Sequence, residues 1–188
     1  MKQIFGYGSL INTESRLVTI PTALDARPAY IKGFIRDFSV WDAIGFRDGK
    51  YKDIGFRALN VTQTEMSADR VNGAVFPVDE TLFNELLFRE KEYGLITVPA
   101  YDYESDAYLG EVEIFSAPRM VTGVSEISEV ELYYLQLCVD GAQAFGNRFY
   151  EEFLETTSVN GRSLREELAQ GPRSFKIHSA GASTRNRT

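Results

Sequence analysis

The sequence predicts an α+β fold in which a mostly antiparallel sheet is combined with a few helices. Two patterns carry this prediction. Short stretches rich in aromatic and β-branched residues recur between turns in the first part of the chain, and two later segments repeat apolar residues at helical spacing. The chain has 188 residues, a length that a single domain can fill while burying a sizeable core.

The expected strands come first along the chain. Residues 2–8 read as a short strand that buries Ile4 and Phe5 and ends at glycines, after which we expect a loop. Further strands are expected near residues 28–40, 54–62, 71–78, 94–103 and 107–117. Between them, residues 41–53 form a turn-rich excursion without a clear period, which is a candidate border of a site.

Helices are expected at residues 79–91, 128–145 and 147–156. Asp79 can cap the first, and Phe83, Leu86 and Leu87 form its apolar stripe. The second helix places a set of mostly apolar residues on one face, namely Tyr134, Leu137, Cys138, Gly141, Ala142 and Phe145.

Composition limits the partners and the chemistry. The formal net charge is −7, so the average surface repels phosphate backbones and anionic membranes, and we expect neither nucleic acid nor a membrane as a partner. Cys138 is the only cysteine, and the apolar stretch at the start is too short for a signal peptide or a membrane span, which favours the cytoplasm. The only histidine, His178, lies in an irregular C-terminal segment. A carboxylate is therefore the expected base, because histidine-dependent catalysis and metal binding need histidine in the core.

A carboxylate continues the apolar stripe of the first helix. The position seven residues after Phe83 is Glu90, and a carboxylate held against apolar neighbours should have a raised pKa unless it is paired. Such groups are candidate acid/base catalysts. The alternative is a glutamate at the fraying helix end that pairs with Arg89, Lys91 or Arg36. Because helix ends shift by a residue or two, the spacing leaves both interpretations open.

Two glycines straddle a tyrosine where the first strand ends, in residues 5–11 (FGYGSLI). Glycine permits backbone geometries in which successive N–H groups point into one concavity and bind an anion. The segment does not fit a dinucleotide fingerprint, which needs glycine at Ile11, or a serine nucleophile elbow, which needs glycine at Tyr7 and Ile11. A strand-ending turn without a ligand is the alternative.

These two segments resemble the γ-glutamylcyclotransferase superfamily. Residues 5–11 are similar to its glycine-rich YGSL loop and to the FGYGSLIW form of the glutathione-specific, ChaC-type branch, with Asn12 in place of the tryptophan. Residues 88–91 (FREK) resemble the segment of that branch that carries the catalytic glutamate, and Tyr93 follows. Weaker matches keep the order at residues 33–38, 72–76 and 134–146. The last is similar to the Y-x6-GA-x3-G pattern of the classical cyclotransferases.

The resemblance implies a small, mostly antiparallel β-barrel flanked by helices. It places this domain in residues 1–160, with a C-terminal extension of unknown role in residues 161–188. It implies that Glu90 is the catalytic acid/base and that the substrate is bound by Tyr7, Gly8, Ser9, Leu10 and Tyr134. The implied partner is a small-molecule γ-glutamyl substrate, which is closed into 5-oxoproline with release of its amine or peptide partner. Neither a cofactor nor a metal is expected.

The sequence is also compatible with other roles for several of these residues and with other substrates. Tyr134 also fits an ordinary amphipathic core tyrosine, and Cys138 a small buried hydrophobe. Arg36 and Arg89 could each pair with Glu90 or with a carboxylate of the substrate. The substrate could be a γ-glutamylamine in place of glutathione or a γ-glutamyl amino acid. A non-enzymatic module that binds a small acid in the same cavity is the alternative from another functional class.

Overall fold

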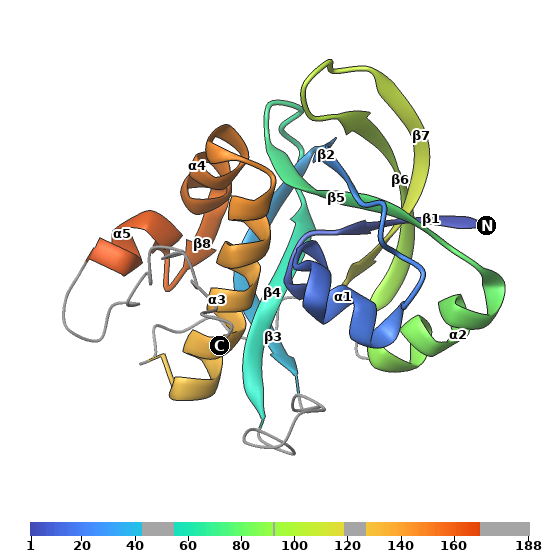
Figure 1. Cartoon of the computed structure of the whole chain (residues 1–188). Coiled ribbons are helices and arrows are strands. Elements are labelled where there is room, and N and C mark those ends of the chain that lie inside the picture. Colours follow the sequence, from blue (N-terminus) through green and yellow to red (C-terminus); the bar gives the residue numbers. More distant parts are fainter. Residues whose placement is uncertain (43–54, 92, 119–126, 170–188) are drawn as a thin grey trace, which may run out of the picture.

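The computed structural model describes residues 1–42, 55–91, 93–118 and 127–169. Most of the excursion at residues 41–53, and residues 170–188 with His178, lie outside this part of the chain. The described residues form a closed five-stranded barrel, a second sheet of four strands, and helices packed around them (Figure 1). This is the α+β architecture predicted from the sequence. None of the helices in these ranges is long and apolar enough to cross a membrane.

The barrel wall consists, in spatial order, of β1 (Lys2–Gly6), β5 (Arg70–Val78), β2 (Arg27–Lys32), β6 (Gly94–Asp102) and β7 (Tyr108–Ser116). Neighbouring strands are antiparallel except β1 and β7, which run parallel and close the barrel where Ile4 lies opposite Glu113. The barrel is therefore mostly antiparallel, as the resemblance implied, and mixed because of this single parallel closure.

The second sheet has the order β4 (Phe56–Gln63), β3 (Phe34–Asp42), β8 (Thr157–Val159) and β9 (Arg162–Ser163). The single stretch expected at residues 28–40 is two strands in two sheets. The chain turns between them at Gly33, whose φ of +75° is a left-handed geometry that glycine adopts readily. Strands β8 and β9 were not predicted, because two or three residues are too short to show an alternating pattern.

Helices α2 (Glu80–Arg89), α3 (Glu129–Ala144) and α4 (Asn147–Thr156) confirm the predicted helices. Asp79 caps α2 by accepting a hydrogen bond from the N–H of Leu82, and Ser128 begins α3 with a capping box. The prediction of a loop after the first strand was wrong in part, because residues 13–19 form helix α1 (Thr13–Thr19). A short helix, α5 (Leu164–Ala169), follows β9.

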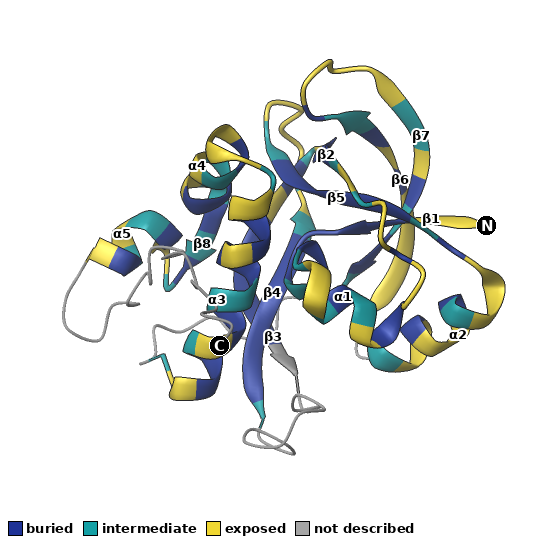
Figure 2. Ribbon diagram, viewed as in Figure 1, coloured by how far each residue is buried: buried dark blue, intermediate teal, exposed yellow. Residues whose placement is uncertain are grey.

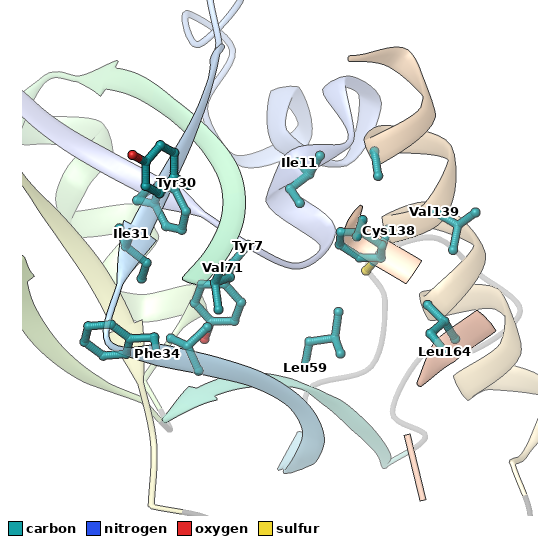
Figure 3. Packing of buried hydrophobic residues seen from close by; sticks show 14 of the residues in the cluster. Tyr7, Ile11, Tyr30, Ile31, Phe34, Leu59, Val71, Cys138, Val139 and Leu164 are labelled. Atoms are coloured by element: carbon teal, nitrogen blue, oxygen red, sulfur yellow. The ribbon is translucent and has the colours of Figure 1, made fainter. Parts of the chain in front are cut away.

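The buried positions are dark blue in Figure 2, and the buried apolar side chains form two clusters. The larger joins the barrel interior to the space between the second sheet, α3 and α4. In it Cys138 of α3 lies near Ile11 and Leu59 (Figure 3). The smaller cluster brings together α2, the segment after α1, and strands β1, β5 and β7. On α2, Phe83 and Leu86 are buried as predicted, whereas Leu87 is 36% exposed.

Candidate active site

A pocket opens where the end of β1, the end of α2, β4 and α3 meet. Its lining residues are Phe5, Gly6, Tyr7, Gly8, Ser9, Leu10, Leu59, Glu90, Tyr93, Phe115 and Tyr134. All six site residues named from the sequence are among them. The empty space within it is about 330 Å³, open mouth included.

The carbonyl groups of the segment that follows β1 accept hydrogen bonds from within the protein. The C=O groups of Gly8 and Ser9 accept hydrogen bonds from the N–H groups of Ile11 and Asn12 at 2.9 and 3.1 Å, which forms the short 3-10 helix η1 (Ser9–Ile11). The C=O groups of Tyr7, Leu10 and Ile11 accept from arginine side chains. The backbone between Tyr7 and Asn12 is thus fixed by its carbonyl groups.

The N–H groups of Gly8, Ser9 and Leu10 remain for a ligand. Within the described residues they donate no hydrogen bond to another protein atom. In a trans peptide the C=O and N–H point in opposite directions, so the bond that holds the Tyr7 carbonyl aims the Gly8 N–H the other way. Successive N–H groups of this kind form an anion-binding concavity.

Two buried arginines hold the segment from behind. Arg16 donates to the carbonyl oxygens of Leu10 and Ile11 at 3.0 and 3.1 Å, and Arg36 donates to that of Tyr7 at 3.3 Å. The hydrogen bonds that both make within the described residues go to uncharged oxygens, such as the Asn72 carbonyl at 2.7 Å from Arg36. Burial lowers the pKa of Arg16, and lowers that of Arg36 to about 9. A guanidinium with this pKa is still charged at pH 7, so positive charge behind the loop favours an anion in front of it.

Glu90 lies at the C-cap of α2, one residue beyond the helix. Its N–H donates to the Leu86 carbonyl and its own carbonyl accepts from the Tyr93 N–H, both at 2.9 Å. The side chain is 16% exposed, and its Oε1 lies 3.0 Å from Nε of Arg89. The two interpretations of Glu90 are therefore compatible: it is a helix-end glutamate paired with Arg89, and it also lines the pocket.

Three tyrosines surround the pocket and are anchored by backbone groups. The hydroxyl of Tyr134 accepts a hydrogen bond from the Leu59 N–H at 3.1 Å, and the hydroxyl of Tyr93 donates to the Leu59 carbonyl at 3.3 Å. Tyr7 donates to the Phe115 carbonyl. Burial raises the pKa of Tyr7 and of Tyr134, and the negative charge of Glu90 raises both further. Both phenols therefore stay protonated at neutral pH.

Strand β4 lies at the edge of its sheet, and the pocket side chains cover that edge. Besides Leu59, the N–H of Arg57 donates to Glu131 at 3.0 Å, and the carbonyl of Val61 accepts from Ser116 at 2.7 Å. Side chains here take the place of a neighbouring strand, which protects the edge from further pairing. The tyrosines thus fix the pocket wall as well as line it.

Close contacts with neighbouring atoms explain why glycine stands at two positions near the pocket. A β-carbon at Gly141 of α3 would lie 2.5 Å from the backbone nitrogen of Asn12, so α3 packs directly on the backbone after η1. This contact brings Tyr134 to the pocket. Asn12, which replaces the tryptophan of the ChaC-type form, caps α1 by accepting from the Ser15 N–H at 3.1 Å. At Gly8 the φ is −121°, so space, and not a left-handed backbone, calls for glycine there.

Sequence reasoning did not assign five of the pocket residues to the site, namely Phe5, Gly6, Leu59, Tyr93 and Phe115. Phe5 and Gly6 belong to the glycine segment that it singled out. Tyr93 had a signal in the sequence, because it lies two residues after the FREK segment, and its hydroxyl reaches β4 in the structure. Leu59 and Phe115 are apolar strand residues of a common kind, and nothing in their local pattern marks them. Arg36 contacts the loop and α4, and the contacts described for it do not include Glu90.

The fold is that of the γ-glutamyl cyclotransferases. A solved structure named gamma-glutamyl cyclotransferase matches with a TM-score of 0.62 and 19% identity, over 81% of this chain and 85% of that one. The uncharacterised human protein loc79017 matches with a TM-score of 0.63 and 20% identity over the same shares of the two chains. YkqA from Bacillus subtilis has a TM-score of 0.60 and 14% identity, over 80% of this chain and 52% of that one. No protein-family model and no curated protein sequence matches the chain.

Proposed function

We propose that the protein cyclises a γ-glutamyl compound to 5-oxoproline and releases the amine or peptide partner, with Glu90 as the general acid/base. One observation carries the proposal: the carboxylate of Glu90 and the unused N–H groups of residues 8–10 line the same pocket. A base and an anion site are the two elements that this reaction needs. The fold, which is shared with a structure named gamma-glutamyl cyclotransferase, supports the same activity.

The reaction is an intramolecular acyl transfer. The α-nitrogen of the substrate attacks its own γ-carbonyl carbon, and the bond from that carbon to the partner's nitrogen breaks. The α-ammonium loses two protons on the way to the lactam, and the partner's nitrogen gains two as it leaves as an ammonium. An ionised Glu90 can accept each of these protons in turn from the first nitrogen and pass it to the second, so the carboxylate is unchanged after each turnover. Water is not consumed.

Negative charge develops on the γ-carbonyl oxygen when the ring closes. The N–H groups of Gly8, Ser9 and Leu10 are donors for that oxygen or for the α-carboxylate of the substrate. The buried charges of Arg16 and Arg36 behind the loop favour either anion. Since nucleophile and electrophile belong to one molecule, holding the substrate in its folded shape contributes much of the rate, and effective molarities reach about 10⁵ M in favourable systems.

The test is a substrate panel. The protein is incubated with glutathione, γ-glutamyl-alanine and γ-glutamyl-lysine, and 5-oxoproline is measured by mass spectrometry. Release of 5-oxoproline from at least one compound, with an equal amount of the partner, is the expected result and identifies the substrate class. If no compound is turned over at high protein concentration while one of them raises the melting temperature, the protein is a binding module instead.

A further inference from the structure

The guanidinium of Arg89 connects three parts of the site. Its Nε lies 3.0 Å from Oε1 of Glu90, and its Nη2 donates to the hydroxyl of Ser9 at 3.0 Å. Its Nη1 donates to the hydroxyl of Thr19 at 2.8 Å and to the carbonyl of Ser15 at 3.4 Å, both on α1. Each nitrogen of the Arg89 side chain therefore contacts an oxygen atom. Through these contacts, one guanidinium connects the end of α2, the glycine loop and α1.

This arrangement differs from an ordinary surface ion pair. The Arg89 and Glu90 side chains are 22% and 16% exposed, so both are largely shielded from water. A pair of long, solvated side chains contributes little because both must be ordered and water screens them. Here the hydroxyls of Ser9 and Thr19 already hold the guanidinium in place, so the carboxylate meets a cation that is fixed in advance.

We propose that Arg89 is the positioning residue of Glu90: it fixes the carboxylate at the pocket wall, keeps it ionised, and ties it to the glycine loop. This inference rests on the proposed function, in which Glu90 must begin the cycle as an anion. An opposite charge within about 4–6 Å favours the ionised form of a carboxyl group. The bond to Ser9 couples the base to the segment whose N–H groups donate no hydrogen bond within the described residues.

The other titratable groups around the pocket do not supply this charge. Tyr7 and Tyr134 face it from the end of β1 and from α3, and burial raises the pKa of both, so they stay neutral. Tyr93 is the third phenol of the pocket wall. From β3, Arg36 and Asp37 act on Tyr7 with opposite signs. Among the described contacts, Arg89 places a cation directly against the Glu90 carboxylate.

The experiment measures the titration of Glu90 directly. Protein labelled with ¹³C at the glutamate carboxyl carbon is titrated by NMR, and the Glu90 signal is assigned by its loss in Glu90→Gln. The variants are Arg89→Gln, which removes the charge, and Arg89→Lys, which keeps the charge but not the planar fork. Arg148→Gln is the matched control, because Arg148 is an exposed arginine that pairs with Glu104 on another face. Circular dichroism checks that each variant is folded.

Arg89→Gln is expected to raise the titration midpoint of Glu90 by about one pH unit or more. Arg89→Lys should restore most of that shift, and Arg148→Gln should leave the midpoint unchanged. In the active protein the acid limb of kcat/KM should move with the midpoint, and kcat should fall by about 10- to 100-fold in Arg89→Gln, on the scale expected for a misplaced catalytic group. A Glu90 midpoint that is the same in wild type and in both Arg89 variants overturns the proposal.

The two proposals fail in different ways. If the wild-type protein releases no 5-oxoproline from any compound of the panel, the proposed function is wrong, and the NMR titration still decides whether Arg89 governs the ionisation of Glu90. If the wild-type protein is active and the Glu90 midpoint does not respond to Arg89, the proposed function stands and the positioning role is wrong.

Discussion

The hydroxyl oxygen of Tyr134 lies 2.8 Å from the point that a β-carbon would occupy at Gly8. The next atoms, Cβ of Leu59 at 3.6 Å and Cζ of Tyr134 at 3.9 Å, are at ordinary contact distances. A single oxygen atom therefore decides whether a side chain fits at this position of the loop. The same oxygen accepts the hydrogen bond from the Leu59 N–H, so the loop, α3 and β4 depend on one another here.

This contact predicts that the effects of substitutions at Gly8 and Tyr134 are not additive. Gly8→Ala should destabilise the protein by about 1–3 kcal/mol, because the new methyl group displaces the phenol. Tyr134→Phe should cost about 1–3 kcal/mol, because it leaves the Leu59 N–H without its acceptor. The double variant should lose clearly less unfolding free energy than the sum of the two single variants, because the oxygen that obstructs the methyl group is gone. Denaturant unfolding of wild type, both single variants and the double variant measures this double-mutant cycle. Strictly additive losses of unfolding free energy would contradict the close contact between Gly8 and Tyr134.

A second prediction separates the backbone of the loop from its hydroxyl group. Ser9→Ala should reduce kcat/KM by less than about tenfold, because the N–H groups that bind the anion remain. Gly8→Val should abolish turnover, because its side chain meets Tyr134 and crowds the pocket. Mass spectrometry of the protein during turnover should show no covalent glutamyl adduct. Such an adduct, together with loss of activity in Ser9→Ala, would replace the intramolecular mechanism with a serine nucleophile.

The packing of α3 on the loop provides a third prediction. Gly141→Ala would bring a β-carbon to 2.5 Å from the Asn12 nitrogen and 2.7 Å from its Cα, and backbone atoms cannot yield as a side chain can. We expect a loss of about 1–3 kcal/mol in unfolding free energy and a larger KM, since Tyr134 moves with α3. Gln143→Ala is the control, because Gln143 is an exposed residue of the same helix. Equal stabilities of the two variants would argue against this close contact.

A fourth prediction concerns the buried pair that anchors the start of α3. Nε of Arg57 lies 2.8 Å from Oε1 of Glu131, and the side chains are 3% and 5% exposed. Burial alone would raise the pKa of Glu131, but the hydrogen bonds from Arg57 and Ser128 outweigh it and hold the pKa below its usual value. Glu131→Gln leaves Arg57 uncompensated and should cost about 3–5 kcal/mol at pH 7.

The pH dependence of this cost has a definite sign. Because the pKa of Glu131 is lower in the folded state, its contribution is complete above the unfolded value of about 4.3 and is lost as the pH falls through the folded value. The stability gap between wild type and Glu131→Gln should therefore shrink below about pH 4. Glu129→Gln, at an exposed position two residues earlier in the same helix, should show no such gap. A gap that is independent of pH would assign the effect to packing.

Local patterns were sufficient to predict the fold class and the three longer helices. The Asp79 cap and the apolar stripe identified α2, and the apolar face identified α3, because these signals are local in the sequence. The sequence did not show that Gly33 divides one apolar stretch between two sheets, because strand pairing depends on residues far apart in the chain. It also missed α1, although Asn12 is a good N-cap, because that helix is short and its stabilising contacts are tertiary.

The candidate site was predicted in outline. The glycine loop and Glu90 were found through two short motifs, and the structure brings them to one pocket with Tyr134. Its electrostatics were not predicted. Arg16 received no attention in the sequence, and the roles of Arg36 and Arg89 were left open, because which oxygens a guanidinium reaches depends on the folded chain. The position of Glu90 at the helix end, one residue beyond α2, is within the usual uncertainty of helix boundaries.

The most direct test of the account is the rate of 5-oxoproline release by wild type and by Glu90→Gln, with the best compound of the panel as substrate. The amide keeps the shape of the side chain but cannot carry the proton, so kcat should fall by about 10²- to 10⁴-fold with little change in KM or in melting temperature. Glu85→Gln, an exposed position on the same helix, should behave as wild type. Turnover by Glu90→Gln within a few-fold of wild type would contradict the assignment of Glu90 as the general acid/base.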